Sequence, residues 1–192
     1  MRPAPAEIPA RLETARLYLR RYEEGDGRWY FTMSLRNRTH LSRYESENPA
    51  MAIASERDAE EVVRSFALQW AEGRNFFLGV FDRTNDDFVA QVFIGLVSLE
   101  LPEFQIGYFV DTAHEGRGYV TEAVRAAMRF VFQHLHAYRL RLECDDTNER
   151  SMRVAEHCGM VREGHLRRNK KNKDGTISGT MIYGLLKSEL AP

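Results

Sequence analysis

The 192-residue sequence predicts an α+β fold, in which a mixed and mostly antiparallel sheet of about seven strands is flanked by helices. Three apolar runs follow one another between residues 75 and 110 with only short turns, which is typical of an antiparallel meander. A glycine-containing turn and an amphipathic helix come next, over 116–135, and lead into a further strand. Because such a helix crossover joins strands of one sheet, we expect the sheet to be antiparallel first and mixed afterwards.

Each strand is assigned where apolar and polar residues alternate or where a short β-rich run occurs, and each helix where apolar residues recur every three or four positions. Gly, Pro, Asn and Asp mark the turns between them. The strands are expected over 16–22, 75–81, 88–100, 105–110, 138–144, 161–168 and 180–186. The helices are expected over 28–36, as a short helix with a loop within 37–54, from the cap at Ser55 to Gly73, over 120–135 and over 149–158.

Composition bounds the class of protein. The content of 43% apolar and 29% charged residues is that of an ordinary globular chain, and residues 14–192 fit one domain. Residues 1–13 contain three prolines and are expected to form a flexible tail. Cys144 and Cys158 are too few for a disulfide framework and have no zinc-ligand spacing nearby, so we expect neither a disulfide nor a metal site.

Charge and hydropathy restrict the partners. The formal net charge of −1 gives no general attraction to nucleic acid or to acidic membranes. No apolar run approaches the ~20 residues that span a bilayer, and residues 1–9 lack the apolar segment of a signal peptide. We therefore expect a cytoplasmic protein with no membrane partner and no specific nucleic-acid partner.

The glycine turn carries the strongest chemical signal. Gly116 and Gly118 lie between an apolar strand ending at Val110 and the start of a helix. Glycine tolerates positive φ and leaves no side chain in the way, so neighbouring backbone N–H groups can close around an anion. The first turn of the helix adds unpaired N–H donors and the positive end of its dipole. The stretch therefore predicts a cradle for a phosphate or pyrophosphate.

Two longer motifs contain this turn and a second helix start. The first comprises 107–110 and 114–123, and the second runs over 146–160. Together with Arg-Glu-Gly at 162–164 and Tyr-Gly-Leu-Leu at 183–186, they resemble the GNAT family of acetyl-CoA-dependent N-acetyltransferases, and within it the RimJ/RimL-type protein N-acetyltransferases. The resemblance runs from about residue 14 to residue 190. It implies the GNAT acyl-CoA N-acyltransferase fold, acetyl-CoA as co-substrate, and direct acetyl transfer to a primary amine, with a protein N-terminal α-amine as the favoured acceptor.

The same resemblance implies where coenzyme A binds. The implied contacts are Phe109, Val110, Asp111, Glu115, Gly116, Arg117, Gly118, Tyr119, Val120, Asn148 and Ser151. The strand before the loop is expected to separate from its neighbour over 109–111, so that its backbone pairs with the pantetheine arm as an added strand would. Ala113 departs from the Gln or Arg that begins this loop in the family. Because backbone N–H groups make the main pyrophosphate contacts, we expect little loss.

The resemblance also assigns two steps of the chemistry. Acetyl transfer requires deprotonation of the amine, stabilisation of an oxyanion and accommodation of the leaving thiolate. Ser151 is implied to stabilise or protonate the thiolate, because Ala155 stands where many family members have a tyrosine. The expected oxyanion donor is the backbone N–H of Phe109 or Val110.

Glu103 is taken as the candidate general base beside Ser151, and Glu45 and Glu47 are kept as alternatives. Gln105 occupies a position where RimJ/RimL-like sequences often have a glutamate, and an amide cannot accept the proton. Glu103 shares its strand face by the period of two, whereas Glu45 and Glu47 lie in the segment where an acceptor would dock. The residues expected around the acceptor are Tyr44, Glu45, Gln105, Tyr108 and Tyr183.

Alternative functions remain at this point. The acceptor is otherwise a small amine such as an antibiotic or a polyamine, or the chain is a non-catalytic acyl-CoA-binding module or an unrelated phosphate-binding regulatory domain. The basic run 167–173 is favoured as a solvated hairpin tip over a contact with RNA or an acidic partner. Edge strands at this hairpin leave open the formation of a homodimer.

Overall fold

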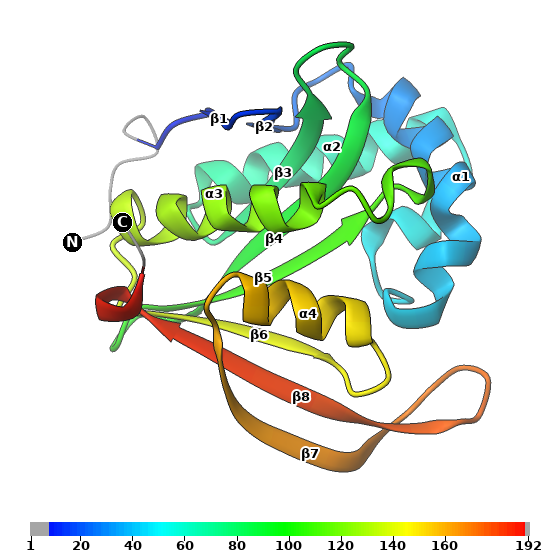
Figure 1. The fold of residues 1–192 in the computed structure, drawn as a ribbon. Helices are drawn as coiled ribbons and strands as arrows, with labels where there is room; N and C mark the ends of the chain where they lie inside the picture. The colour runs from blue at the N-terminus through cyan, green and yellow to red at the C-terminus, as the bar shows by residue number, and fades with distance from the viewer. Residues whose placement is uncertain (1–7, 191–192) are drawn as a thin grey trace.

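The computed structural model describes residues 8–190, which form one eight-stranded sheet with helices on both faces (Figure 1). The strands lie in the order β1-β2-β3-β4-β5-β6-β8-β7, and every neighbouring pair is antiparallel except β5 and β6. The strands are β1 (Arg11–Glu13), β2 (Leu17–Arg21), β3 (Asn75–Asp82), β4 (Phe88–Ser98), β5 (Glu103–Val110), β6 (Arg139–Asp145), β7 (Val161–Lys171) and β8 (Ile177–Leu186). The helices are α1 (Gly27–Tyr44), α2 (Glu56–Ala71), α3 (Tyr119–Gln133) and α4 (Glu149–His157), with single 3₁₀ turns at Pro49–Ala52, Thr112–His114 and Lys187–Glu189. The predicted α+β fold, a meander followed by a helix crossover, is confirmed.

Strand β1 is where the structure departs from the predicted N-terminal tail. Residues 1–7 of that tail lie outside the described residues, but Arg11–Glu13 pair antiparallel with β2. Ile8 is only 6% exposed and belongs to the core. The extended backbone that proline favours is also that of an edge strand, so the proline-rich composition did not distinguish a free tail from an eighth strand.

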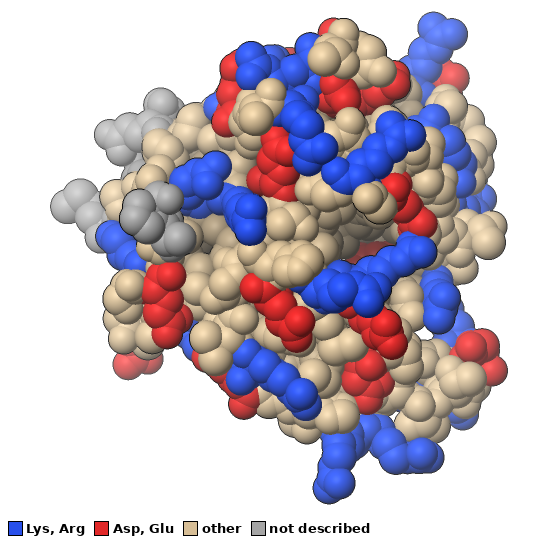
Figure 2. All heavy atoms as spheres, in the orientation of Figure 1, with Lys and Arg blue, Asp and Glu red and all other residues tan. Residues whose placement is uncertain are grey.

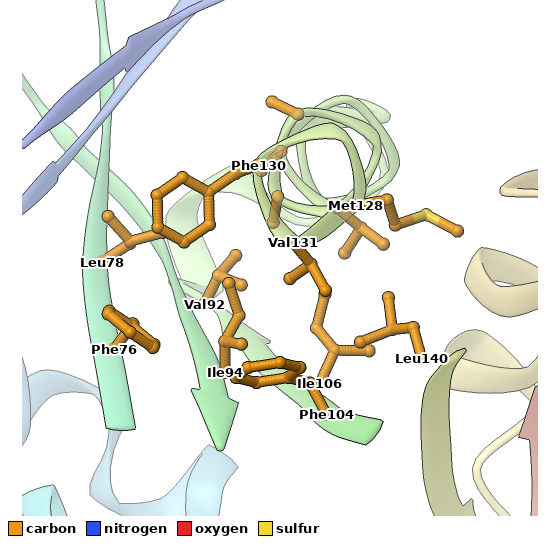
Figure 3. Close-up of a cluster of buried hydrophobic side chains, with 14 of the residues drawn as sticks. Phe76, Leu78, Val92, Ile94, Phe104, Ile106, Met128, Phe130, Val131 and Leu140 are labelled. Atoms are coloured by element: carbon orange, nitrogen blue, oxygen red, sulfur yellow. The ribbon is translucent and has the colours of Figure 1, made fainter. Parts of the chain in front are cut away.

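Helix α3 packs across β4 and β5 and builds the larger core (Figure 3). Its apolar residues fall on one stripe, as their spacing predicts, and four of them are fully buried: Ala123, Val124, Ala127 and Val131. Figure 3 shows Met128, Phe130 and Val131 above the sheet residues Val92, Ile94 and Ile106. Helices α1 and α2 cover the opposite face over a second, aromatic-rich core.

Helix α1 continues to Tyr44 instead of ending near residue 36. Its buried positions Met33, Asn37 and Leu41 recur every four residues, so they form one continuous stripe. Because Asn37 is polar, the apolar periodicity of the sequence does not continue through this stripe and does not predict the second half of the helix. The Asn37 amide group is satisfied in the structure by the Met33 carbonyl (3.0 Å) and the Asp111 carboxylate (2.9 Å). No helix among residues 8–190 has the length and apolar character needed to cross a bilayer.

The sheet opens between its two parallel strands. Strands β5 and β6 pair only over 103–105 and 139–141 and then diverge, while β5 stays paired with β4 as far as Val110 (Figure 1). The opening therefore begins after Gln105, earlier than the predicted separation over 109–111. Within residues 8–190, the edge of β5 after Gln105 and the facing edge of β6 after Arg141 have no strand partner.

Candidate active site

The opening holds two cavities that meet inside the sheet. The first has a volume of about 760 Å³ and lies toward α4, and the second has about 1320 Å³ and lies toward the β7–β8 hairpin. The residues that line both are Arg43, Tyr44, Glu45, Gly107, Tyr108, Phe109, Thr147 and Lys170. Figure 2 shows a hollow with Lys and Arg side chains on its rim, where Figure 1 places the end of β5 opposite α4. A molecule entering one cavity can therefore meet a molecule entering the other.

The glycine loop lies at the mouth of the first cavity, between its lining residues Glu115 and Val120. Gly116 and Gly118 both have φ of +74°, in the left-handed region that glycine occupies without strain. Gly118 is also the N-cap of α3 and offers no capping side chain. The backbone N–H groups of 115–121 donate to no acceptor among residues 8–190. The loop thus presents a continuous set of donors to an anion, as the sequence predicts.

Asp111 fixes this loop to α1. Its carboxylate is fully buried and accepts hydrogen bonds from the side chains of Arg36 and Asn37 and from the backbone N–H of Ala113. Burial opposes ionisation, but these hydrogen bonds outweigh it and lower the pKa of Asp111. Asp111 was expected to contact coenzyme A. Its side chain instead orients the loop, and its backbone N–H is engaged with the Val89 carbonyl (2.8 Å).

The free edge of β5 selects which amides face the opening. Hydrogen-bonded pairs alternate along an antiparallel ladder. Because Asp111 donates to Val89 of β4, the N–H of Phe109 also points to β4, and the N–H groups of Tyr108 and Val110 point into the opening. Of the two predicted oxyanion donors, the geometry therefore favours Val110. Phe109 contributes its side chain, which lines both cavities.

Helix α4 forms the opposite wall of the first cavity. Asn148 is its N-cap and accepts the Ser151 N–H at 3.2 Å. The Ser151 hydroxyl lies 3.1 Å from the Tyr108 hydroxyl, and either group can act as the donor. The Ser151 carbonyl lies at the same distance, 3.1 Å, from the Tyr108 hydroxyl, and when Tyr108 donates its proton to that carbonyl the Ser151 hydroxyl is the donor to Tyr108. Both Asn148 and Ser151 line the cavity. The pair Ser151–Tyr108 places two hydroxyls at the point where the cavities approach each other.

The structure separates the candidate bases. Glu45, at the C-terminal end of α1, lines both cavities, and burial raises the pKa of its carboxyl against the opposing charge of Lys170. Glu103 lines neither cavity and is bound to Arg139 at 3.0 Å, at the end of the sheet where β5 and β6 are still paired. Glu47 lines the second cavity, where Lys173 approaches it at 3.4 Å. Of these three glutamates, only Glu45 lines both cavities and so lies at their junction, the region formed by the residues that line both.

Other predicted residues occupy varied positions. Glu115 bridges the first cavity between Arg150 of α4 (2.6 Å) and His40 of α1 (3.4 Å). Tyr119 turns its hydroxyl to Asp82 (3.0 Å), away from the cavity, so only its backbone faces the anion site. Arg117 is exposed, and its carbonyl accepts a hydrogen bond from Arg16 at 3.0 Å.

Some of the predicted acceptor residues line the cavities and one does not. Tyr44 joins the end of α1 to the β6–α4 loop by donating to the Thr147 carbonyl at 3.2 Å, and it lines both cavities. Gln105 lines the first cavity and is held by Arg141 at 3.2 Å. Tyr183 lines neither cavity. It is 1% exposed in the larger core and donates to Glu156, because its strand position faces α3 and α4 rather than the opening.

Two groups of lining residues were not predicted. Gln91 and Phe93 on β4 line the second cavity. Gln91 is a polar residue between apolar residues in the first half of that strand, and this was the feature of the sequence that could have indicated it. The basic run 167–173 is largely exposed, as expected, but Lys170 lines both cavities and Lys173 returns to the segment after α1. That long-range return had no signal in the local sequence.

Nucleophilic cysteine chemistry is disfavoured by the geometry. Cys144 lines the first cavity near Ser151, and Cys158 lies behind α4 with its thiol 3.7 Å from the Thr121 carbonyl. Burial raises the pKa of both thiols to about 11, so both are protonated near neutral pH. In the described part of the chain, no group of three or more His, Cys, Asp or Glu residues is arranged to hold a metal ion.

Comparisons with known proteins agree with this geometry. The profile of the "Acetyltransferase (GNAT) domain" family matches residues 16–161. The chain is 35% identical to "Probable N-acetyltransferase YjcK" of Bacillus subtilis (strain 168) over 50% of its own length, and that match spans only about half, 54%, of the relative. It is 28% identical to "Spermidine N(1)-acetyltransferase" of Vibrio cholerae (79% of this chain, 83% of the relative). It is 23% identical to "Ribosomal-protein-serine acetyltransferase" of Escherichia coli (71% and 74%).

A solved structure supports the fold. Mycobacterium smegmatis RimJ, determined in complex with CoA-disulfide, superposes with a TM-score of 0.86 at 21% identity, covering 100% of this chain and 93% of RimJ.

Proposed function

The chain belongs to the GNAT acetyltransferase family, and we propose that it transfers the acetyl group of acetyl-CoA to a primary amine, namely the N-terminal α-amine of a protein, by direct attack in a ternary complex. The observation that carries the proposal is a set of N–H groups at 115–121 that have no acceptor within residues 8–190. They lie at the mouth of a cavity that meets a second cavity inside the sheet. The loop suits the pyrophosphate of acetyl-CoA, and the meeting of the cavities suits two substrates.

The first cavity provides the groups that acetyl-CoA requires. Residues 115–121 supply donors for the pyrophosphate, and the free edge of β5 at Tyr108 and Val110 supplies backbone groups for the pantetheine amides. Arg150 and Arg153 line the same cavity and add positive charge. Its volume of about 760 Å³ is of the size that small-molecule sites have.

The junction provides the groups for the transfer. Glu45 accepts a proton from the incoming ammonium group, directly or through water, so that the neutral amine attacks the thioester carbon. The Val110 N–H stabilises the oxygen as the C–N bond forms. The Ser151 hydroxyl, next to Tyr108, donates to the sulfur as the C–S bond breaks. The thiols play no covalent part, because burial keeps them protonated.

The second cavity supports a peptide as the acceptor. Its volume of about 1320 Å³ is larger than that of the first cavity. It lies between the end of α1 and the β7–β8 hairpin, where a chain terminus can enter. The E. coli relative named for a ribosomal protein agrees with this acceptor. A polyamine is the second candidate, because Glu45 and Glu47 line this cavity and one relative is named for spermidine.

Steady-state release of CoA tests the proposal. The protein with acetyl-CoA is assayed against short peptides with free N-termini, against spermidine, and against the same peptides with acetylated N-termini as the matched control. We expect free N-terminal peptides to accelerate CoA release and blocked peptides to leave it at the background of hydrolysis. The proposed function is abandoned if no amine accelerates release, and the polyamine acceptor replaces the peptide if spermidine alone does so.

A further inference from the structure

Gln91 is a buried polar side chain on the wall of the second cavity. It lies on β4, directly across from Phe109 of β5, and is 2% exposed. Phe77 and Phe93 line the same cavity beside it, with their ring centroids 4.8 Å apart. A buried amide within aromatic walls is costly unless its polar atoms are satisfied. Its hydrogen-bond partners therefore indicate what the cavity is built to hold.

Two buried tyrosines fix the orientation of the Gln91 amide. Tyr22 and Tyr30 both direct their hydroxyls to Oε1 of Gln91, at 2.7 and 3.1 Å. Burial raises the pKa of both phenols, so each keeps its proton and needs an acceptor. No other acceptor serves these hydroxyls among the described residues. The reversed amide would leave both hydroxyl hydrogens unpaired, so the carbonyl oxygen faces the tyrosines and the NH₂ group faces away.

The NH₂ group of Gln91 is left for an occupant of the cavity. Nε2 donates to no acceptor among residues 8–190 and is not one of the fully buried polar atoms of that range, so it reaches the cavity that Gln91 lines. An N–H donor carries partial positive charge, so it attracts a neutral oxygen and disfavours a second ammonium group. The neighbouring Phe77 and Phe93 rings lower the local dielectric and so strengthen both effects. A peptide presents a carbonyl oxygen close to its terminal amine, whereas a polyamine presents only further cations.

We propose that Gln91 is a specificity-determining residue that binds a carbonyl oxygen of the acceptor and so selects N-terminal peptides over amines without oxygen. Gln91 lies opposite Phe109, which lines both cavities, so the bound oxygen lies within a few bonds of the reacting amine. This inference rests on the proposed function for its acceptor class. Its own measurement is an equilibrium affinity, which does not require turnover.

The test compares two ligands and two variants by calorimetry on the protein saturated with CoA. Alanyl-alanine amide carries carbonyl oxygens, and n-hexylamine is a primary amine of similar length without oxygen. Gln91→Met removes the donor at nearly the same size. Gln91→Glu, measured at pH 8, keeps an oxygen for both tyrosine hydroxyls and replaces the donor with an acceptor. Thermal unfolding of each variant establishes that it is folded before its affinity is used.

We expect the wild-type protein to bind the peptide about tenfold more tightly than hexylamine, and both variants to lose that preference. The inference is overturned if the preference is absent in the wild-type protein or unchanged in a folded variant. CoA release is followed separately, with the same wild-type protein, variants and ligands but with acetyl-CoA in place of CoA. Turnover with amines but no Gln91-dependent preference overturns the inference alone, whereas a Gln91-dependent preference without turnover overturns the proposed function alone.

Discussion

The two cavities differ in what builds them. At the mouth of the first cavity, the anion site is formed by the backbone N–H groups of 115–121, and the helix cap Asn148 lies on the opposite wall, so these groups come from two short segments. The second is formed by side chains from elements distant in sequence, such as Glu47, Gln91 and Lys173, which do not line the first. A cavity built from local backbone geometry constrains residue type strongly, because few residues adopt that geometry. In a cavity built from side chains, the residue type at each position depends on the substrate that the side chain contacts.

The largest expected effect comes from breaking the backbone geometry of the first cavity. Gly118→Val forces a β-branched residue to φ of +74°, where strain amounts to roughly 1–3 kcal/mol and the loop relaxes away from its conformation. Misplacing two N–H donors to a charged phosphate is expected to weaken acetyl-CoA binding at least about 100-fold. Calorimetric titration with acetyl-CoA measures this loss.

The matched control is Gly73→Val. Gly73 also has a positive φ, of +65°, and no heavy atom within 4 Å of an added Cβ, but it ends α2 and lines neither cavity. It is expected to lower stability by a similar amount and to leave acetyl-CoA affinity unchanged. Equal losses of affinity in both variants would mean that strain, rather than the anion cradle, controls binding.

The next effect belongs to the junction of the cavities. Glu45→Gln removes the proposed base and is expected to lower kcat about 100- to 1000-fold with acetyl-CoA affinity retained. Burial raises the pKa of Glu45 above that of an ordinary carboxyl, so the wild-type kcat/KM falls as the pH drops through that raised value. The variant lacks this limb of the pH profile.

Glu103→Gln is the comparison for that variant. Glu103 is bound to Arg139 away from both cavities, so its substitution is expected to change kcat less than about threefold, in the range of ordinary surface substitutions. A large loss of kcat in Glu103→Gln together with a normal rate in Glu45→Gln would reverse the assignment.

A smaller effect is expected at the paired hydroxyls. Ser151→Ala and Tyr108→Phe each remove one member of the contact at 3.1 Å and are expected to lower kcat roughly tenfold, a loss typical of one hydrogen bond made in the transition state. Since the two hydroxyls act as a unit, the double variant is expected to lose little more than either single one. Additive losses would show that each hydroxyl acts separately.

The fold was predictable where local patterns decide it. The α3 stripe, the meander and the caps at Ser55 and Asn148 follow from spacing and from residue type, and the structure confirms them. The second half of α1 was missed because Asn37 interrupts its apolar stripe, and its partner Asp111 is distant in sequence. Strand β1 was missed because an edge strand and a free extended tail share the same backbone preference.

In the candidate site, too, features decided by local sequence could be predicted and features decided by distant contacts could not. The glycine loop could be recognised from Gly116 and Gly118, because a positive φ favours glycine at that position and is therefore visible in the residue type. Glu45 could only be ranked beside Glu103 and Glu47 from sequence, because the deciding fact is which carboxyl reaches the junction in three dimensions. Tyr183 was assigned to the acceptor side although its strand alternation turns it to the core. The pairing of β8 with β6 decides that orientation, and local sequence does not.

The smallest expected effect concerns Asp111, the residue that joins the glycine loop of the first cavity to helix α1, which leads to Glu45. Its buried carboxylate holds Ala113 of the cofactor loop and Arg36 and Asn37 of α1, whose last turn leads to Glu45. Asp111→Asn keeps the shape and loses the charge. Because Arg36 is half exposed and can return to solvent, the expected cost is about 1–2 kcal/mol of unfolding free energy, measured by urea unfolding at pH 7.

The pH dependence of that cost has a defined sign. The pKa of Asp111 is lowered in the folded state, so its contribution is fully present above the unfolded value of about 3.9 and is lost as the pH falls through the folded value. The gap between wild type and Asp111→Asn therefore closes in acid. If the two cavities are independent, the variant raises KM for acetyl-CoA alone. If Asp111 couples them through α1, KM for the peptide rises as well, because the end of the helix that carries Glu45 shifts with the loop.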